Sequence, residues 1–454
     1  MEEFSKKQKL FNTVQLLIFF NLLLALIAFI KDIVLASYFG TSETADAFSL
    51  AFFLPDMLGN NLIGAAVAVS SIPVFTKLAL LGDRFHYDEI LQKLGAMLLT
   101  GTLILFIFLL LLADPFFHFF HFNTDSTIST VIPYFYIMAP IVLIAPLWLM
   151  GSSVLQASSK FVVPALTPIV FNCILLLSLL WCQWAGIPQK LGGEIFSFVT
   201  TFATLCACII TWYYVMKRQK IKWSFQSLQM TKNKEIQKLA SVFGAYSLIL
   251  LFSQASLFAE RLFASSLETG SIAALTYAYR ISQFPLWVFI AAINTFILPT
   301  ISAHLEKKDF FSLKRDLYMS SFFVIGTAIL ISLVLVIFSK PLLSIILARG
   351  SFTLHSVQLT SDILKGYGLS IVGQSLFVFC TRYYIAKGRM MPPLLIGMLG
   401  SCVNIALLFF FVPRFGLIGI GYAVTVASSL SGGWLLIHFI KSLFSVEKRG
   451  VSFE

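Results

Sequence analysis

Apolar residues follow one another in long runs along most of the chain, and each run ends where charged or turn-forming residues interrupt it. The hydrocarbon core of a bilayer is about 30 Å thick, and a helix of about 20 apolar residues crosses it. Division of the chain on this criterion predicts twelve membrane-spanning helices and an all-α polytopic membrane protein. Their predicted limits are 12–38, 45–75, 94–113, 130–155, 162–184, 195–216, 239–263, 271–302, 320–339, 361–386, 392–412 and 417–440.

Several of the predicted spans are long and contain prolines. A proline has no backbone N–H, and its ring clashes with the preceding helical turn, so a proline inside a helix bends or interrupts it. We therefore expect bent or broken helices at Pro55, Pro140, Pro285 and Pro299.

The basic residues predict the orientation in the membrane. Of the 32 Lys and Arg residues, 23 lie in the terminal segments and in alternate loops, 5 lie on the opposite side and 4 lie inside spans. Basic loops stay on the cytoplasmic side, so both termini and the loop 217–238 are predicted to be cytoplasmic. This excess also accounts for the net charge of +11. We expect attraction to anionic lipid and no nucleic-acid partner.

The loop 217–238 divides the chain into a six-span lobe over 1–216 and a second over 239–454, whose residues correspond at a nearly constant offset. Six spans return the chain to the same side, so the repeat is predicted to be parallel, with a pseudo-twofold axis along the membrane normal. Transporters of this type hold substrate between the halves and alternate access by rocking one half against the other. The matched pairs, 229 or 230 residues apart, are Lys31 with Arg261, Gly40 with Gly270, Pro55 with Pro285, Ala157 with Ala386, Lys160 with Arg389 and Pro164 with Pro393.

The composition excludes several classes of protein. With 58% apolar and only 12% charged residues, almost all of the chain is expected in the bilayer. The sequence has no P-loop, so an ion gradient, the membrane potential or the substrate gradient must drive any transport. The six cysteines and six histidines lack metal-binding spacing. We therefore predict no zinc site and no resident cofactor.

Eight charged residues inside the predicted spans stand out as candidates for a function. An ionised side chain at the membrane centre costs at least about 2.5–3.5 kcal/mol, so such residues face a cavity or a partner. One interpretation is a basic cavity for an anionic head group such as a diphosphate, with Lys31, Arg261 and Arg280 as its cations. The other is structural pairing, of Lys31 with Asp46 or of Arg261 with Asp32. Arg280 has no acid three or four residues away, which favours the cavity role for it, while both interpretations stay open for Lys31 and Arg261. The eight residues are Lys31, Asp32, Asp46, Asp56, Glu260, Arg261, Arg280 and Arg382.

Glu260 and Arg261 are neighbours in the chain, and adjacent residues on a helix point about 100° apart, so only one of them can face a cavity squarely. If Arg261 does so, Glu260 is left for another task. A buried carboxylate with polar neighbours is a candidate Na⁺ or H⁺ site, and Asn404 and Thr425 are candidates to complete it. The alternative for Asn404 is a hydrogen bond that joins two helices.

Four segments of the chain carry motifs that occur together, in this order, in one family. The sequences are KD, FG, ADAF and LPD from Lys31 to Asp56, FVVPALTP from Phe161 with Asn172, YAYR, FP and LP from Tyr277 to Pro299, and RGSFT and RYYIA from Arg349 to Ala386. They resemble the MurJ (MviN) family of lipid II flippases, within the MOP superfamily of exporters, over about residues 15–395.

The resemblance implies a two-lobe bundle that moves lipid II, an undecaprenyl-diphosphate-linked peptidoglycan precursor, from the inner to the outer leaflet by alternating access. It implies a transporter and not an enzyme, in the bacterial cytoplasmic membrane, with membrane lipids as partners. We expect a monomer, coupled to Na⁺, H⁺ or the membrane potential. In the chain, Glu260 lies near the position of a span-seven acid that resembles part of a cation site in some family members. The charge pattern and the resemblance together predict substrate-binding residues at Lys31, Asp32, Asp46, Arg261, Arg280, Gln283 and Arg382.

The chain departs from the family pattern in span two and elsewhere. Gly59 and Asn60 stand where the family commonly has an arginine pair, Ala25 stands where many members have another arginine, and Gln283 replaces a frequent glutamate. Twelve spans are fewer than the fourteen of typical members, and this count is more like that of polysaccharide-unit flippases of the same superfamily.

Other functions therefore stay open at this point. They are a flippase for another polyprenyl-linked oligosaccharide, a cation-coupled drug exporter, a membrane glycosyltransferase or polymerase, and a silent family member that acts as an assembly scaffold. A drug exporter would need an acidic cavity, which four embedded basic residues argue against. A glycosyltransferase would need acids on a large outer loop, and the loops at 113–130 and 340–361 contain few.

Overall fold

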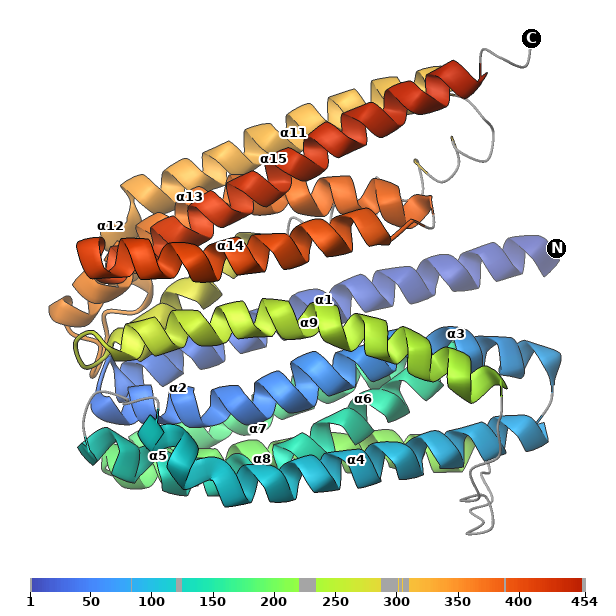
Figure 1. Ribbon diagram of the computed structural model, residues 1–454. Coiled ribbons are helices and arrows are strands. Elements are labelled where there is room, and N and C mark those ends of the chain that lie inside the picture. The colour runs from blue at the N-terminus through green and yellow to red at the C-terminus, as the bar shows by residue number, and fades with distance from the viewer. Residues whose placement is uncertain are drawn as a thin grey trace. The chain divides into compact units, whose positions relative to one another are not determined.

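Figure 1 shows the computed structural model of the chain, in which the described secondary-structure elements are helices. The structure describes residues 2–82, 84–119, 125–219, 234–286, 310–387 and 389–450, together with 301 and 304. The chain forms two compact units, Met1–Gln254 and Ala255–Glu454. The lobe limits at 1–216 and 239–454 remain predictions, and most of the predicted linker, residues 220–233, lies outside the described part.

The first unit is built from helices α1 to α8, with one π-helical segment, η1. Helix α1 packs against α7, α2 against α5, and α6 against α3, α8 and η1. The bounds are α1 Glu2–Phe39, α2 Glu43–Asp56, η1 Met57–Gly64, α3 Ala65–Leu81, α4 Arg84–Phe119, α5 Asp125–Met138, α6 Ile141–Ala157, α7 Val162–Trp184 and α8 Gln189–Gln219.

Helix α9 begins in the first unit and ends in the second. Within the second unit, α13 packs against α11, α12 and α15, and α14 packs against α15. A further helix covers residues 271–286. The other bounds are α9 Lys234–Ser265, α11 Phe310–Ile337, α12 Ser339–Ile346, α13 Leu354–Ala386, α14 Met391–Phe415 and α15 Leu417–Gly450.

Among the described residues, 11 segments are long and apolar enough to cross a membrane, and each contains or largely overlaps one predicted span. The remaining predicted span, 271–302, is helical over 271–286, and its second half lies outside the described residues. The spanning segments are Gln15–Phe39, Glu43–Leu81, His86–Phe119, Thr127–Ala157, Val162–Trp184, Gln189–Lys217, Leu239–Ser265, Phe311–Ile337, Leu354–Ala386, Met391–Phe415 and Leu417–Ser442.

Two of the four prolines mark irregular helices, as expected. At Pro140 a turn separates α5 from α6, so this span consists of two helices. Pro55 lies in the last turn of α2, directly before the π-helical segment η1. Pro285 lies one residue before the end of the described helix 271–286, and Pro299 falls outside the described residues.

The internal repeat is visible in the turns between helices. After α6, the N–H of Lys160 donates to the carbonyl of Leu155 at 2.8 Å, and after α13 the N–H of Arg389 donates to that of Tyr384 at 2.9 Å. These four positions correspond at the offset of 229. Gly186 and Gly416 precede α8 and α15 with φ of 62° and 59°, a left-handed conformation that glycine adopts without strain. The two units therefore repeat the same helix–turn–helix structure.

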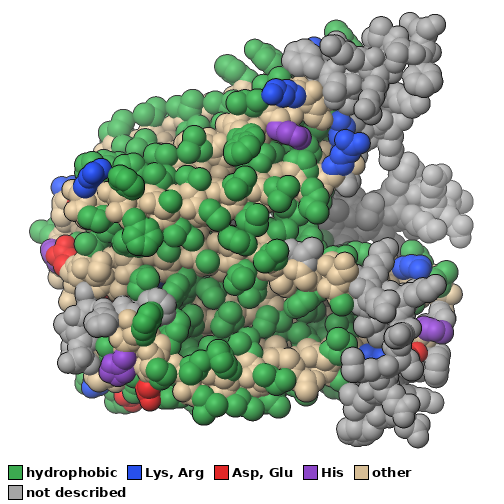
Figure 2. All heavy atoms as spheres, viewed as in Figure 1, with side chains coloured by type: hydrophobic (Ala, Val, Ile, Leu, Met, Phe, Trp, Pro, Cys, Tyr) green, Lys and Arg blue, Asp and Glu red, His purple; other side chains and the backbone are tan. Residues whose placement is uncertain are grey.

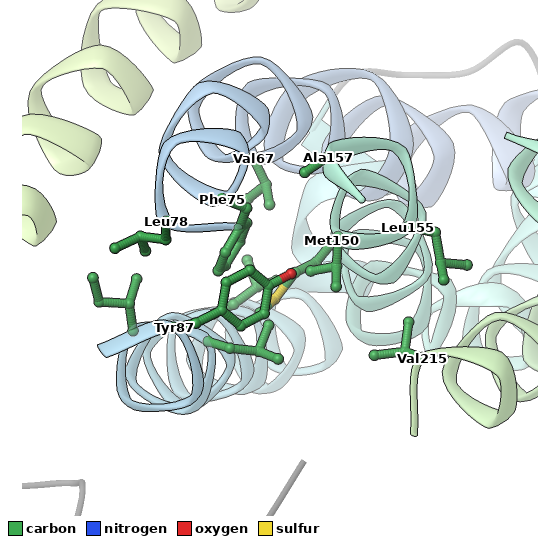
Figure 3. Close-up of a cluster of buried hydrophobic side chains, with 12 residues drawn as sticks. Val67, Phe75, Leu78, Tyr87, Met150, Leu155, Ala157 and Val215 are labelled. Atoms are coloured by element: carbon green, nitrogen blue, oxygen red, sulfur yellow. The ribbon is translucent and has the colours of Figure 1, made fainter. Parts of the chain in front are cut away.

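Apolar packing holds the helices of the first unit together. Figure 3 shows buried side chains from α3, α4, α6 and α8 meeting in one cluster, in which the rings of Phe75 and Tyr87 have centroids 5.2 Å apart. Other large apolar side chains point outward, such as Ile104 and Phe322 at 66% and 78% exposure, and Figure 2 shows such side chains covering the visible faces. Outward apolar groups of this kind suit contact with lipid. Because lipid chains are themselves apolar, the contacts between helices are stabilised by close packing and not by the removal of apolar surface from water.

In the second unit, glycines bring the backbones of α13 and α15 into direct contact. A Cβ atom added at Gly366 would lie 2.4 Å from Cα of Gly421, and one at Gly432 would lie 2.4 Å from the carbonyl oxygen of Gly373. Small residues of this kind allow close approach of membrane helices. This glycine seam fixes α13, which also carries several of the candidate site residues.

Adjacent glycines on α15 provide a matched test of the seam, because a Cβ atom at Gly433 would meet nothing within 4 Å. We predict that Gly432→Val lowers the melting temperature of the purified protein by several degrees, since overpacking a close contact costs about 1–3 kcal/mol. Gly433→Val should leave it nearly unchanged. Thermal unfolding in detergent, followed by tryptophan fluorescence, measures both, and equal melting temperatures for the two variants would contradict the seam.

Candidate functional site

In the first unit, three predicted charged residues lie on α1 and at the start of α2. Nζ of Lys31 lies 3.0 Å from Oδ1 of Asp32, and the two side chains are 10% and 19% exposed. Asp46 is buried in the first turn of α2, which begins after Ser42, whose Oγ accepts a hydrogen bond from the N–H of Ala45. Acids in a first turn interact favourably with the helix N-terminus. The charge of Lys31 is thus compensated on its own helix, a pairing that the sequence pattern did not single out.

In the second unit, Glu260 on α9 is the centre of a buried hydrogen-bond network. Its side chain is buried, its Oε2 accepts from the hydroxyl of Tyr367 at 2.6 Å, and its Oε1 accepts from Nδ2 of Asn404 at 2.8 Å. Asn404 Nδ2 also donates to Oγ of Ser256 at 2.8 Å. One carboxylate therefore joins α9, α13 and α14. Hydrogen bonds to a charged group contribute about 1.5–3 kcal/mol each, and loss of a buried partner costs more than loss of an exposed one.

The third predicted member of the cation site, Thr425, bonds to the backbone of α13. Thr425 on α15 donates to the carbonyl of Gly366 at 2.7 Å, directly beside Tyr367 in the chain. The structure therefore brings Glu260 and Asn404 into direct contact, and connects Thr425 to them through the backbone of α13. The role predicted for Asn404 as a link between helices is also fulfilled, since its amide bonds α14 to α9.

Gln283 is tied to the same part of α13. Its Nε2 donates to Oε1 of Gln374 at 3.1 Å, and Nε2 of Gln374 donates to Oγ of Ser370 at 2.8 Å. The Ser370 hydroxyl in turn donates to the backbone carbonyl of Tyr367 at 2.7 Å. A continuous polar chain thus leads from Gln283 to the backbone beside the Glu260 network.

The three predicted arginines of the second unit are partly buried. Nη1 of Arg261 donates to the carbonyl of Leu257 on α9 at 3.1 Å. Arg280 follows Tyr279, whose ring centroid is 6.0 Å from that of Tyr367, so the backbone at Arg280 is close to the Glu260 network. Nε of Arg382 on α13 is buried and has no hydrogen-bond partner among the described atoms.

No group of three or more His, Cys, Asp or Glu side chains that could hold a metal ion occurs among the described residues. The buried Oδ1 of Asn404 has no hydrogen-bond partner within the part of the chain that the structure describes. This oxygen lies on the side chain whose Nδ2 donates to Glu260, so the network contains more than one oxygen atom of the kind that binds hard cations.

Tyr367 and Ser256 are functional candidates that the sequence reasoning missed. Tyr367 contacts Glu260 across 107 positions of the chain, and no motif spacing reports such a contact. The available signal was a tyrosine between two glycines, Gly366 and Gly368, inside an apolar span. A second cluster that the sequence reasoning did not bring together is that of Asp56 with Asn60 and Asn61 in span two.

The chain has many membrane spans, some of which carry buried charges, and its two helical units repeat the same helices and turns. These features define the class of polytopic membrane transporters. The family model described as "Lipid II flippase MurJ" matches residues 35–454. The chain belongs to this family.

Curated relatives agree with this assignment over most of their length. The chain is 25% identical over 447 residues to a Borreliella burgdorferi protein named "Probable lipid II flippase MurJ", covering 94% of this chain and 82% of the relative. It is 26% identical over 402 residues to a Thermotoga maritima protein of the same name, covering 88% of this chain and 79% of the relative.

Solved structures share the fold. A lipid II flippase MurJ in an inward closed conformation has a TM-score of 0.79 at 22% identity, over 95% of this chain and 89% of that one. An inward-facing multidrug resistance MATE transporter of the MOP superfamily has a TM-score of 0.81 at 13% identity, over 93% and 96%. The predicted MOP-type architecture is therefore confirmed.

Proposed function

We propose that the chain is a flippase that moves lipid II from the inner to the outer leaflet of the bacterial cytoplasmic membrane. The match of the MurJ family model to residues 35–454 carries this proposal, and the relatives named as lipid II flippases support it. The chain acts as a transporter and not as an enzyme, as a monomer, with both termini cytoplasmic. The excess of basic residues on one side supports that orientation.

The embedded basic residues supply the chemistry that this substrate needs. A polyprenyl diphosphate has an anionic head that hydrocarbon excludes and an apolar tail that can stay in lipid. Each unit, taken by itself, supplies embedded cations suited to the diphosphate, Lys31 in the first and Arg261 and Arg280 in the second. Asp32 holds Lys31 in place through their 3.0 Å ion pair, while Asp46, Gln283 and Arg382 complete the binding residues. A negative cell interior favours outward movement of an anion by about 2.3 kcal/mol per charge per 100 mV.

The Glu260 network is the proposed site of cation coupling. The Glu260 carboxylate, Oδ1 of Asn404 and the hydroxyl of Thr425 are oxygen ligands of the kind that Na⁺ accepts, and a proton could bind Glu260 alone. A bound cation would neutralise the buried carboxylate. Because Glu260 bonds to α13 and α14, a change in its charge alters the contacts among three helices, which is how the ion would act on the conformation.

We predict that Arg280→Ala stops most lipid II transport while leaving folded protein in the membrane. Loss of one charge-assisted hydrogen bond costs about 1.5–3 kcal/mol, which corresponds to about a ten- to hundredfold slower rate. The measurement is lipid II in the outer leaflet of cells that depend on this chain, scored by its accessibility to a membrane-impermeant reagent. Arg414→Ala, at an exposed arginine that contacts Phe410, is the matched control and should transport normally. Normal transport by Arg280→Ala would contradict the assigned role.

We predict that Glu260→Gln removes any dependence of lipid II transport on an imposed Na⁺ or H⁺ gradient, because the amide carries no charge for the cation to neutralise. Purified protein in liposomes, with labelled lipid II and each gradient applied separately, measures this and identifies the ion. Glu268→Gln, at an exposed acid beyond the end of α9, is the control and should keep the wild-type dependence. A Glu260→Gln protein that still responds to the gradient would place the coupling site elsewhere.

A further inference from the structure

Span two contains a π-helical segment, η1, over Met57–Gly64. It lies between α2 and α3 within the continuous spanning segment Glu43–Leu81. Helices of this type are rare; they occur mostly as short insertions in α-helices, and these insertions are frequent at functional sites. The segment coincides with Gly59 and Asn60, the positions at which the chain departs from the arginine pair of the family.

The π-helical turn brings three polar side chains together. Nδ2 of Asn60 donates to Oδ1 of Asp56 at 2.8 Å, and Nδ2 of Asn61 donates to Oδ2 of Asp56 at 2.9 Å. In an α-helix, a residue five positions on lies about 140° around the axis from the first, so Asn61 could not share this carboxylate. The wider π turn places positions four and five residues on beside the first. The cluster of Asp56, Asn60 and Asn61 is therefore a product of the π-helical geometry.

Glycines fix the position of this cluster from the other side of the helix. A Cβ atom at Gly59 would lie 3.0 Å from the carbonyl oxygen of Ile141, and one at Gly64 would lie 2.4 Å from a methyl carbon of Leu149. Both glycines are buried and five residues apart, so η1 packs one side against α6. The polar cluster thus sits on a segment that close packing holds in place.

The cluster is accessible although it lies near the middle of a 39-residue span. Asn61 is exposed, and Asp56 and Asn60 are partly exposed. Exposed carboxylate and carboxamide groups at this depth are unfavourable against lipid chains, and such groups face a water-filled cavity instead. The polar side of η1 is therefore expected to face water and not lipid chains.

We propose that Asp56, Asn60 and Asn61 bind the sugar head group of the transported lipid through its hydroxyl and amide groups. This inference rests on the proposed function and adds to it a determinant of head-group selectivity. Each asparagine uses one N–H on Asp56 and keeps a second N–H and a carbonyl oxygen, so the two offer both donors and acceptors. Sugar hydroxyls and N-acetyl groups present the complementary mixture.

The charge of the cluster indicates that its ligand is not the diphosphate. A diphosphate offers acceptors and negative charge, and the carboxylate of Asp56 would repel it. Two arginines at these positions would attract it, and this chain has Gly59 and Asn60 there. The cluster therefore recognises the uncharged polar part of the substrate, while the lysine and arginines described above bind the diphosphate.

The test compares two probes on the purified full-length chain, lipid II and undecaprenyl diphosphate, which lacks the sugar. In the wild type, lipid II should bind more tightly than undecaprenyl diphosphate. Asn61→Leu should weaken lipid II binding about tenfold, as expected for the loss of one or two hydrogen bonds, and leave undecaprenyl diphosphate binding within about twofold. Val69→Leu, at an exposed apolar residue of the same span, is the control and should bind both probes as the wild type does.

Two results would overturn the head-group site. The first is that Asn61→Leu binds lipid II with wild-type affinity. The second is that a variant that melts at the wild-type temperature loses affinity for lipid II and for undecaprenyl diphosphate equally. If the leucine variant does not purify, Asn61→Ala provides the same comparison, because it also removes the carboxamide. A wild-type chain that binds neither probe would instead contradict the proposed function.

Discussion

The bilayer leaves a polar group inside the protein without water, so each such group needs a partner from the protein or a water-filled cavity. Three charged residues of the candidate site meet this constraint with partners from the protein. Lys31 pairs with Asp32, Glu260 accepts hydrogen bonds from two other helices, and Asp56 accepts them from two asparagines of its own helix. These contacts position the site residues, and the apolar cluster of the first unit and the glycine seam of the second support the helices that carry them.

The two units repeat the same helices and turns but carry different polar chemistry. In the first unit, the contacts described for Lys31 and Asp56 are local, between residues one to five positions apart on α1 and across η1. In the second unit, the contacts of Glu260 connect separate helices, so its charge state bears on how those helices pack. We propose a division in which the first unit contributes substrate recognition in span two and the second contributes the response to a cation. Embedded basic residues occur in both units, Lys31 in the first and Arg261, Arg280 and Arg382 in the second.

Much of the fold was predictable from the sequence, because length and hydropathy determine where a helix can cross a bilayer. Matched residues such as Ala157 and Ala386 also predicted the repeat, since each ends a helix at the same turn. The site was less predictable. The contact of Glu260 with Tyr367 depends on the glycine seam that sets the position of α13, and the contact of Asp56 with Asn61 depends on a π-helical turn. Neither hydropathy nor residue spacing reports these geometries.

The most direct test of the account is to deplete this chain in cells that depend on it and to identify the accumulating polyprenyl-linked intermediate by mass spectrometry. The account predicts that lipid II accumulates and that its amount in the outer leaflet falls. Accumulation of a different polyprenyl-linked saccharide, with lipid II still reaching the outer leaflet, would contradict it.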